Sequence, residues 1–394
     1  MHPKLRVGVI FGGQSGEHEV SLVSARSVMA ALDPDKYVVV PIGITHAGRW
    51  LTAGDPLALL AAGGAKAEAK VTRWQGDEVT SHGVTVSPCH PVTVSEIERA
   101  ECELVPGATG RRFPALDVIF PVLHGPFGED GTIQGLLDLA GVPYVGCGVL
   151  ASAVGMDKIA SKAVFAAAGL PQARYLAFIR REWERNPAEV IARIEAALTY
   201  PVFVKPANLG SSIGIAKARD AGELAAALTD AARYDRRLLV EEGVPNAREI
   251  ECAVLGNDDP RASVPGEVVP SNEFYDYAAK YIDGKSALLI PAPLPAALAA
   301  QVREMAVRAY KALDASGLAR VDFLLNGATD ELFINEANTM PGFTAISMYP
   351  KLWEATGLSY AELCDRLIEL AVERHQDRTR SQTSYAGALP TGGE

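Results

Sequence analysis

The sequence contains few cysteines and no CxxC pair. Its five cysteines are scattered and odd in number, which favours free thiols in a reducing compartment over a disulfide framework or a zinc site. It also lacks any run of about 20 apolar residues, the length of a membrane span. The apolar run at 7–11 is too short for the h-region of a signal peptide, which takes roughly 7–15 residues. These absences predict a cytoplasmic protein with no membrane partner.

Positive charge is also scarce. The net charge of −11 argues against a nucleic-acid partner, because a phosphate backbone requires a basic surface. A local basic pocket for a small phosphate ligand is still allowed, since net charge does not describe one cleft. The chain has 394 residues, 48% of them hydrophobic, which is enough for two or three domains with cores of their own.

The order of predicted elements divides the chain into three units. Alternating strands and helices predict a parallel α/β domain over 1–152, with an insertion of short strands at 51–112. A central domain is predicted over 153–243 and a C-terminal domain over 244–375. The tail at 376–394 is polar and interrupted by Gly and Pro, so we expect it to be disordered. Predicted helices cover 20–32, 131–140, 157–168, 188–198, 222–232, 297–313, 349–356 and 360–374, and predicted strands cover 7–11, 37–44, 116–123, 143–145, 173–178, 202–205, 213–217, 238–241, 249–255, 261–269, 318–325 and 331–335.

The loop after the first strand, FGGQSGEHEVS (11–21), is a near match to the dinucleotide-binding pattern G-x-G-x-x-G. Such a loop at a helix start suits an anion, which makes an NAD-binding oxidoreductase one reading. Phe11 stands where the first glycine should be, and a tight turn without a ligand explains the loop equally well. Glu17 and Glu19 crowd the place of a pyrophosphate and would suit an ammonium group better.

A second loop, KPANLGSSIG (205–214), is predicted between two strands. Its glycines and the hydroxyls of Ser211 and Ser212 supply donors that can surround phosphate oxygens. Lys205 at the preceding strand end adds a positive charge. An ordinary hairpin turn would need neither the lysine nor so many small donors, so we favour phosphate binding here.

Three oxygen-bearing side chains are predicted on adjacent strands. Glu336 and Asn338 are two residues apart and project from one face, and Asp322 lies in the preceding strand next to Arg320. Carboxylate and amide oxygens suit Mg²⁺ bound together with nucleotide phosphates. A solvent-facing polar edge is the alternative, but the apolar neighbours make it the weaker one.

Two further segments carry polar groups in loops. Residues 270–287 are rich in Tyr, Asp and Gly and lack either periodicity, as is typical of a lid. HGPFGEDG (124–131) is predicted after a buried strand and combines His124 with two acids. Lys158 follows at a helix start.

Together these segments resemble the D-alanine–D-alanine ligases of the ATP-grasp superfamily from residue 5 to about 372. The matching motifs are GGQSGEHEVS (12–21), HGPFGEDGT (124–132), MDK (156–158), KPANLGSSIG (205–214), FYDYAAKY (274–281), GLARVD (317–322) and NEANTMPGFT (335–344). The resemblance implies an ATP-grasp fold in which an N-terminal parallel α/β domain precedes central and C-terminal α+β domains that enclose ATP.

The resemblance also implies roles for single residues. Asp322, Glu336 and Asn338 would hold two Mg²⁺ ions, with Mn²⁺ as a substitute. Glu17 would bind the ammonium of the first D-alanine, His124 would line the substrate site, and Ser347 and Met348 would hold the carboxylate of the second. Arg320 and the N–H of Gly342 would stabilise the oxyanion, and Ser211 and Tyr281 would connect lid, phosphate loop and Glu17. ATP would be bound by Lys158, Lys205, Ser211, Ser212, Ile213, Glu241, Val244, Glu249 and Lys280.

The implied product is D-alanyl-D-alanine for peptidoglycan synthesis, formed through D-alanyl phosphate, by an enzyme that we expect to be a homodimer. Within the same fold, D-lactate or D-serine ligation is the alternative. Lactate-forming relatives lack a tyrosine matching Tyr281, so the sequence favours alanine over lactate.

Overall fold

The computed structural model describes residues 3–62, 116–210, 213–269 and 287–382. Four predicted site residues therefore lie outside the described residues: Ser211, Ser212, Lys280 and Tyr281. So do most of the predicted insertion, all but one residue of the predicted lid, and the last twelve residues of the tail.

The N-terminal unit contains a four-stranded sheet in the order β3-β2-β1-β4. β1 is parallel to β2 and to β4, and β3 is antiparallel to β2. Val7, Val9 and Phe11 pack into one core cluster with α1, whereas Ile10 packs into a second cluster on the other face. Burial on both faces explains the uninterrupted apolar run of β1. The bounds are β1 Leu5–Gly12, α1 His18–Ala31, β2 Tyr37–Ile44, β3 Trp50–Leu51, α2 Pro56–Ala61, β4 Val118–Pro121, α5 Thr132–Ala140 and α6 Val149–Met156.

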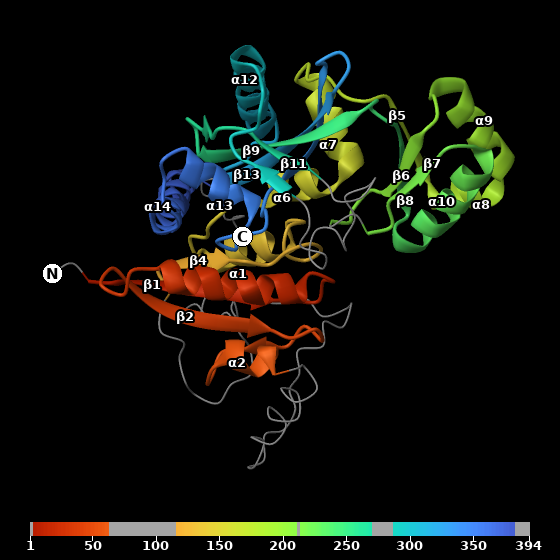
Figure 1. Ribbon diagram of the computed structural model, residues 1–394. Helices are drawn as coiled ribbons and strands as arrows, with labels where there is room; N and C mark the ends of the chain where they lie inside the picture. Colours follow the sequence, from red (N-terminus) through yellow and green to blue (C-terminus); the bar gives the residue numbers. More distant parts are fainter. Residues whose placement is uncertain (1–2, 63–115, 211–212, 270–286, 383–394) are drawn as a thin grey trace, which may run out of the picture.

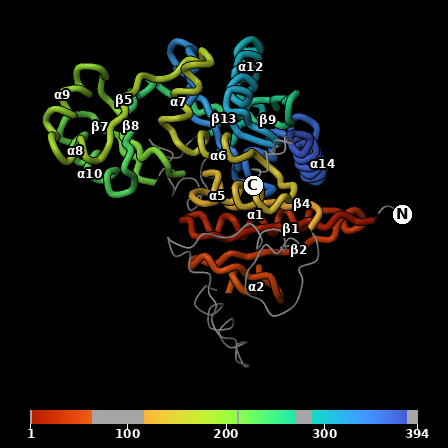
Figure 2. The backbone as a smooth tube through the Cα atoms, turned by 180° about the vertical axis from the view of Figure 1, so that it is seen from behind, coloured from red at the N-terminus to blue at the C-terminus, as the bar shows by residue number. Residues whose placement is uncertain are grey.

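The central unit is an antiparallel sheet, β5-β8-β6-β7, covered by three helices. It projects at one end of the molecule, as both views show (Figures 1 and 2). Asn186 and Asp220 cap α9 and α10 through side-chain oxygens, which accept from N–H groups that the first helical turn leaves unpaired. The bounds are α7 Lys158–Ala167, β5 Tyr175–Ile179, α8 Arg180–Arg185, α9 Pro187–Ala197, β6 Val202–Pro206, β7 Ala216–Ala218, α10 Ala221–Tyr234 and β8 Arg237–Glu242.

The C-terminal unit contains a six-stranded antiparallel sheet in the order β12-β11-β9-β13-β14, with β10 paired to β9. α7 and α12 pack with one face of this sheet, whereas α13 and α14 share a core cluster with β1 and α1. The N-terminal and C-terminal units are thus joined by a common core. The bounds are β9 Ala247–Gly256, β10 Arg261–Ala262, β11 Gly266–Val269, β12 Ala287–Leu289, α12 Ala296–Ala312, β13 Gly317–Asn326, β14 Leu332–Asn338, α13 Met348–Ala355 and α14 Tyr360–Thr379.

Several differences from the predicted elements concern lengths, extra helices and one missing strand. α2, α6 and α8 were not predicted, and the strand predicted over 261–269 is two strands, β10 and β11. The strand predicted over 143–145 is only an isolated bridge between Tyr144 and Ile119. α14 continues to Thr379, so the start of the predicted disordered tail is helical. Arg378 lies in the added turn, and its guanidinium forms an ion pair with Asp138 on α5. No helix in the described part of the chain has the length and apolarity to cross a bilayer.

Candidate active site

A cavity of about 1440 Å³ lies where the three units meet. Its volume exceeds the roughly 300–1,000 Å³ of a typical small-molecule pocket, so it has room for a nucleotide together with amino acids. Apart from Ile213, every predicted site residue that the structure describes lines this cavity. The structure therefore brings together residues that are more than 300 positions apart in the sequence.

The predicted metal ligands lie on β13 and β14, and a β-bulge sets their register. Asp322 is paired with Glu336, and Arg320 is paired with Asn338. The next pair, Phe323 with Ile334, skips Asn335, and a bulge of this kind re-aims side chains near active sites. Asn338 Nδ2 donates to Asp322 Oδ2 at 2.8 Å. Paired residues face the same side of a sheet, so all four of these side chains belong to one face.

Arg320 lies among carboxylates on that face. Its Nε and NH2 groups donate to the two oxygens of Asp322 at 2.7 and 2.6 Å, and its Nε is 2.9 Å from Glu251 Oε2. Burial opposes the charge of Arg320, but Asp322 and Glu251 raise its pKa well above the ordinary value. Glu336 also raises it. One arginine thus faces three carboxylates, and this surplus of oxygen ligands fits Mg²⁺.

Glu251 was missed by the sequence prediction. It pairs with Asp322 across β9 and β13 and lines the cavity. A signal was present, because Glu251 follows Glu249 by two residues and so belongs to the same face of the strand.

The opposite side of the cavity is positively charged. Glu241 is 2% exposed, and its carboxylate binds the ammonium groups of Lys162 and, at 2.7 Å, Lys205. Burial alone would raise the pKa of Glu241, but Lys205 and Lys162 hold it down to about 2. Burial alone would lower the pKa of Lys205, and Glu241 raises it instead. Lys158 donates to Leu209 O at 2.6 Å and lies 4.0 Å from Glu336 Oε2.

Lys162 was the second residue missed. It is four residues after Lys158 on α7, so helical spacing places both on one face. Because both oxygens of Glu241 bind ammonium groups, its side chain holds the lysines in place. A contact of Glu241 with adenine stays a prediction and would have to use the main chain.

Glu17 lies at the junction of the N-terminal and central units. Its N–H donates to Ser15 Oγ at 3.2 Å, and Ser15 Oγ donates to His124 O at 2.6 Å. A Cβ placed on Gly125 would lie 2.6 Å from Glu17 Oε2, and one on Gly210 would lie 3.2 Å from it. Gly125 has a φ of 73°, a conformation that favours glycine, and the loops after β4 and β6 both approach this carboxylate closely.

His124 is buried and has partners on three sides. Its Nε2 is 3.1 Å from Ser24 Oγ, and its Nδ1 is 3.1 Å from Met340 O and 3.7 Å from Glu129 Oε1. Burial lowers the pKa of His124, but Glu129 raises it above the ordinary value. Burial also raises the pKa of Glu129, and the nearby Glu17 adds to that increase. The prediction named His124 without Glu129, although both stand in the quoted motif.

The loop before α13 supplies the last predicted contacts. A Cβ on Gly342 would lie 3.3 Å from Ser347 Oγ, and Ser347 Oγ accepts from Thr344 N at 3.1 Å. Ser347 is the N-cap of α13, and Met348 is the first residue of this helix. A helix N-terminus with unpaired N–H groups attracts a carboxylate.

Family models cover most of the chain. The model described as D-ala D-ala ligase N-terminus matches residues 6–147, and the one described as D-ala D-ala ligase C-terminus matches residues 164–369. The chain belongs to the D-alanine–D-alanine ligase family. The predicted membership is confirmed, and it leaves no support for the NAD-binding reading of the first loop.

Individual family members are similar over nearly the whole length. The D-alanine–D-alanine ligases of Acetivibrio thermocellus and Ruminiclostridium cellulolyticum are each 53% identical, over 96% and 97% of this chain and 99% of their own lengths. Among solved structures, the D-alanine–D-alanine ligase of Coxiella burnetii matches with a TM-score of 0.75 and 36% identity, covering 96% of each chain. The VanG D-Ala:D-Ser ligase of Enterococcus faecalis matches with a TM-score of 0.74 and 36% identity, covering 94% of this chain and all of that one. The predicted ATP-grasp fold is confirmed by these structures.

Proposed function

We propose that the protein joins two D-alanine molecules with the free energy of ATP, giving D-alanyl-D-alanine, ADP and phosphate for peptidoglycan synthesis. The observation that carries this proposal is the cavity between a lysine-bearing wall and a carboxylate-bearing wall, with Glu17 among its lining residues. The family membership supports the choice of substrates. Phosphoryl transfer of this kind depends mainly on positioning and charge neutralisation.

The ATP phosphates would lie against the lysine wall. Lys205 is charged and held by Glu241, so its position is fixed before ATP arrives. Lys158 reaches toward Glu336 from the same side. Val244 and Glu249 line the same cavity and are proposed to contact the adenosine part. Ser211, Ser212, Ile213 and Lys280 are proposed to cover the phosphates.

Mg²⁺ would be held by Asp322, Glu336 and Asn338. When bound, it would neutralise charge that develops on the phosphoryl oxygens. Because Arg320 already holds Asp322 through two hydrogen bonds, the carboxylate is oriented and needs little rearrangement. Glu251 orients Arg320 in turn from β9.

The reaction would take place in two steps. In the first, a carboxylate oxygen of the first D-alanine attacks the γ-phosphorus, ADP leaves, and D-alanyl phosphate forms while Glu17 holds the ammonium group. In the second, the neutral amine of the other D-alanine attacks the acyl carbon, the amine loses a proton, and phosphate leaves. Arg320 and the N–H of Gly342 are proposed to stabilise the tetrahedral oxyanion.

The second D-alanine would be bound by the N-terminus of α13, through Ser347 and Met348. His124 and Glu129 lie near Glu17 and would hold its loop and orient its carboxylate. Tyr281 is proposed to complete the site from the lid.

A second candidate, ligation of D-alanine to D-serine, is favoured by one observation. The VanG D-Ala:D-Ser ligase matches the fold about as well as the ligase of Coxiella burnetii does. The backbone alone therefore does not select the second substrate. The 53% identity to relatives named D-alanine–D-alanine ligase makes D-alanine the first choice.

We also propose a homodimer. Leu136, Leu139, Val149 and Leu150 are exposed on α5 and α6, with Leu139 91% exposed, and these helices pack against each other. A group of exposed apolar side chains of this kind is typical of an interaction surface. Light scattering of the purified chain should give twice the monomer mass, and a monomer at micromolar concentration would contradict the dimer.

Phosphate release from ATP tests the proposed function. Purified protein is incubated with ATP and Mg²⁺ and, separately, D-alanine, L-alanine, D-alanine with D-lactate, and D-alanine with D-serine. We expect phosphate release with D-alanine, dipeptide in equal amount by mass spectrometry, and no release with L-alanine. A mixed D-alanyl-D-serine product in excess of the dipeptide would favour the second candidate, and no release with any amino acid would contradict both.

A further inference from the structure

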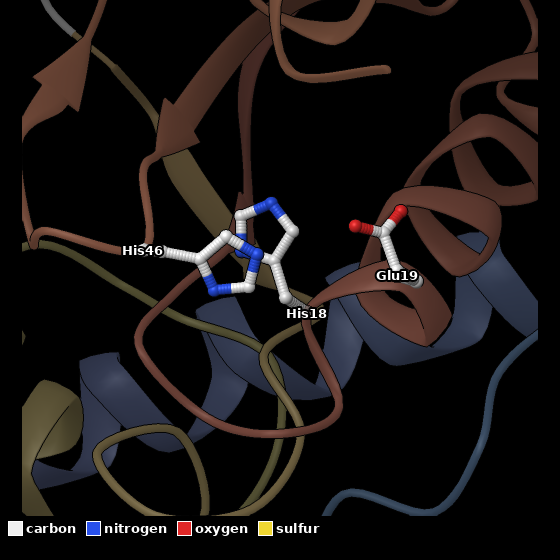
Figure 3. A group of neighbouring side chains, drawn as sticks. All are labelled: His18, Glu19 and His46. Carbon is white, nitrogen blue, oxygen red and sulfur yellow. The ribbon is translucent and has the colours of Figure 1, made fainter. Parts of the chain in front are cut away.

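A cluster of side chains that could bind a metal lies at the start of α1, and one of its members, Glu19, also lines the cavity. His18, Glu19 and His46 each offer one ligand atom, and these atoms all lie within 4.8 Å of one another. The two imidazole rings are stacked, with centroids 3.8 Å apart and planes 23° apart. Figure 3 shows the stacked rings with the Glu19 carboxylate beside them. We propose that His18, Glu19 and His46 form a binding site for a divalent transition-metal ion such as Zn²⁺.

The sheet topology explains why these residues meet. β1 and β2 are parallel neighbours, and Gly12 is paired with Ile44 at their ends. The loops that follow the two strands therefore leave the same edge of the sheet, and Gly13 N donates to Ile44 O at 2.9 Å. His18 begins α1 after the first loop, and His46 lies in the turn after β2.

The His18 ring has the orientation of a metal ligand. Its Nδ1 is 2.7 Å from Gly13 O, and a carbonyl oxygen only accepts, so Nδ1 carries the proton. The lone pair is then on Nε2. Metal-binding histidines commonly donate their other ring N–H to a backbone carbonyl, which fixes the tautomer and the ring. The ring is also held by its surroundings, because it is 3% exposed and a Cβ on Gly12 would lie 3.1 Å from its Cε1.

The other two ligands can adjust to that fixed ring. Ligand atoms of a tetrahedral zinc site, each about 2.0–2.1 Å from the ion, lie about 3.3 Å apart. Glu19 and His46 are both exposed, so rotation of their side chains can bring them from within 4.8 Å to that separation. Two imidazoles and one carboxylate favour Zn²⁺, Ni²⁺ or Co²⁺ over Mg²⁺, which prefers oxygen alone.

Such an ion would connect the start of α1 to the turn after β2. Glu17, which lines the cavity, immediately precedes His18. An ion at His18 and His46 would therefore fix the loop that carries Glu17. This inference does not depend on the ligation reaction, so binding can be measured whether or not the proposed function is correct.

Metal binding by the full chain tests the proposal. The protein is freed of metal with a chelator, saturated with Mg²⁺ so that oxygen-only sites are filled, and titrated with Zn²⁺ by calorimetry. The variants are His46→Asn and Glu19→Gln, both at exposed positions, because a change at the buried His18 could impair folding. His375→Asn, on α14, is the matched control, and Glu336→Gln separates this site from the Mg²⁺ ligands.

We expect one tight Zn²⁺ equivalent in the wild type, His375→Asn and Glu336→Gln. Loss of an outer partner already weakens metal affinity about 10–100-fold, so loss of a ligand in His46→Asn should cost at least as much. Co²⁺ at the same site should give absorption bands of imidazole and carboxylate ligation without those of a thiolate. Unchanged affinity in His46→Asn, a thiolate spectrum, or no tight Zn²⁺ in the wild type would each overturn the proposal.

Discussion

The two walls of the cavity have opposite charge compositions. On the central side lysines predominate: the buried carboxylate of Glu241 binds Lys162 and Lys205, and Lys158 lies 4.0 Å from Glu336 of the other wall. On the C-terminal side, one arginine lies among three carboxylates: Arg320 faces Glu251, Asp322 and Glu336. The lysine-bearing wall thus has Glu241 as a buried counter-charge, and the carboxylate-bearing wall has Arg320.

The difference indicates what each wall is built to bind. A lysine excess suits polyphosphate, and a carboxylate excess suits divalent cations. A buried ion pair is costly to break when one partner is removed. We therefore expect removal of an excess charge to lower the rate of catalysis. Removal of a counter-charge should destabilise the arrangement of charged side chains in that wall.

The largest effect is expected for Glu336→Gln, which removes an excess charge from the anionic wall. Metal-ion charge stabilisation contributes several kcal/mol to such transition states, so turnover should fall by roughly 10³-fold or more. Circular dichroism should show the wild-type fold. Glu331→Gln is the matched control, because Glu331 precedes the same strand and is exposed. Turnover near the wild-type value at low Mg²⁺ would show that Glu336 does not hold the metal.

Arg320→Ala removes the counter-charge of the anionic wall and the proposed oxyanion donor together. Loss of one such donor commonly lowers kcat by roughly 10²–10³. The fall in kcat should exceed the rise in KM for ATP. Arg248→Ala serves as a control, because Arg248 forms an ion pair with Glu267 in the same sheet and does not line the cavity. If KM for ATP alone changed, Arg320 would be a binding residue.

Glu241→Gln tests the counter-charge of the cationic wall. It leaves Lys162 and Lys205 buried without their partner, and broken buried pairs typically cost about 3–5 kcal/mol. The lowered pKa, from 4.5 to about 2, means that this stabilisation is present above about pH 4.5 and is lost as pH falls toward 2. Urea unfolding at pH 7 and at low pH should show a difference from wild type that shrinks on acidification. An equal difference at both pH values would be inconsistent with the ion pairs.

The smallest effect is expected for Tyr281→Phe, which leaves both charged walls intact. The proposed hydrogen bond to Ser211 would be lost, and such a bond is worth about 0.5–1.5 kcal/mol. Dipeptide synthesis should weaken modestly, and D-lactate should become detectable as second substrate at low pH, where the D-alanine amine is protonated. Mass spectrometry of the products formed from a mixture of D-alanine and D-lactate measures whether D-lactate is used. Dipeptide alone across the pH range would place selectivity at Ser347 and Met348 instead.

Much of the fold and of the candidate site could be predicted from the sequence, because the site motifs lie at or directly after the ends of predicted strands. The Gly-rich loop after β1 and the pair Glu336 and Asn338 at the end of β14 are local patterns, and the structure brings them to one cavity. The strand periods also predicted the main sheets, because buried strands have continuous or alternating apolar residues.

What could not be predicted depends on contacts between distant elements. The pairing of Lys162 with Glu241 spans 79 positions and requires α7 to pack beside β8. The bulge at Asn335 is a property of the β13–β14 register, and neither strand encodes it alone. Glu251 was overlooked because its role depends on which strand lies next to β13. The extension of α14 likewise involves a distant contact, the ion pair of Arg378 with Asp138 of the N-terminal unit.

Oxygen transfer from D-alanine to phosphate tests the central claim most directly. If the two walls bring the γ-phosphoryl group to a carboxylate oxygen, that oxygen leaves with phosphate when the peptide bond forms. D-alanine labelled with ¹⁸O in its carboxylate should therefore give one ¹⁸O in the released phosphate for each dipeptide, measured by mass spectrometry. Unlabelled phosphate alongside dipeptide formation would contradict the acyl phosphate and the arrangement of the walls that supports it.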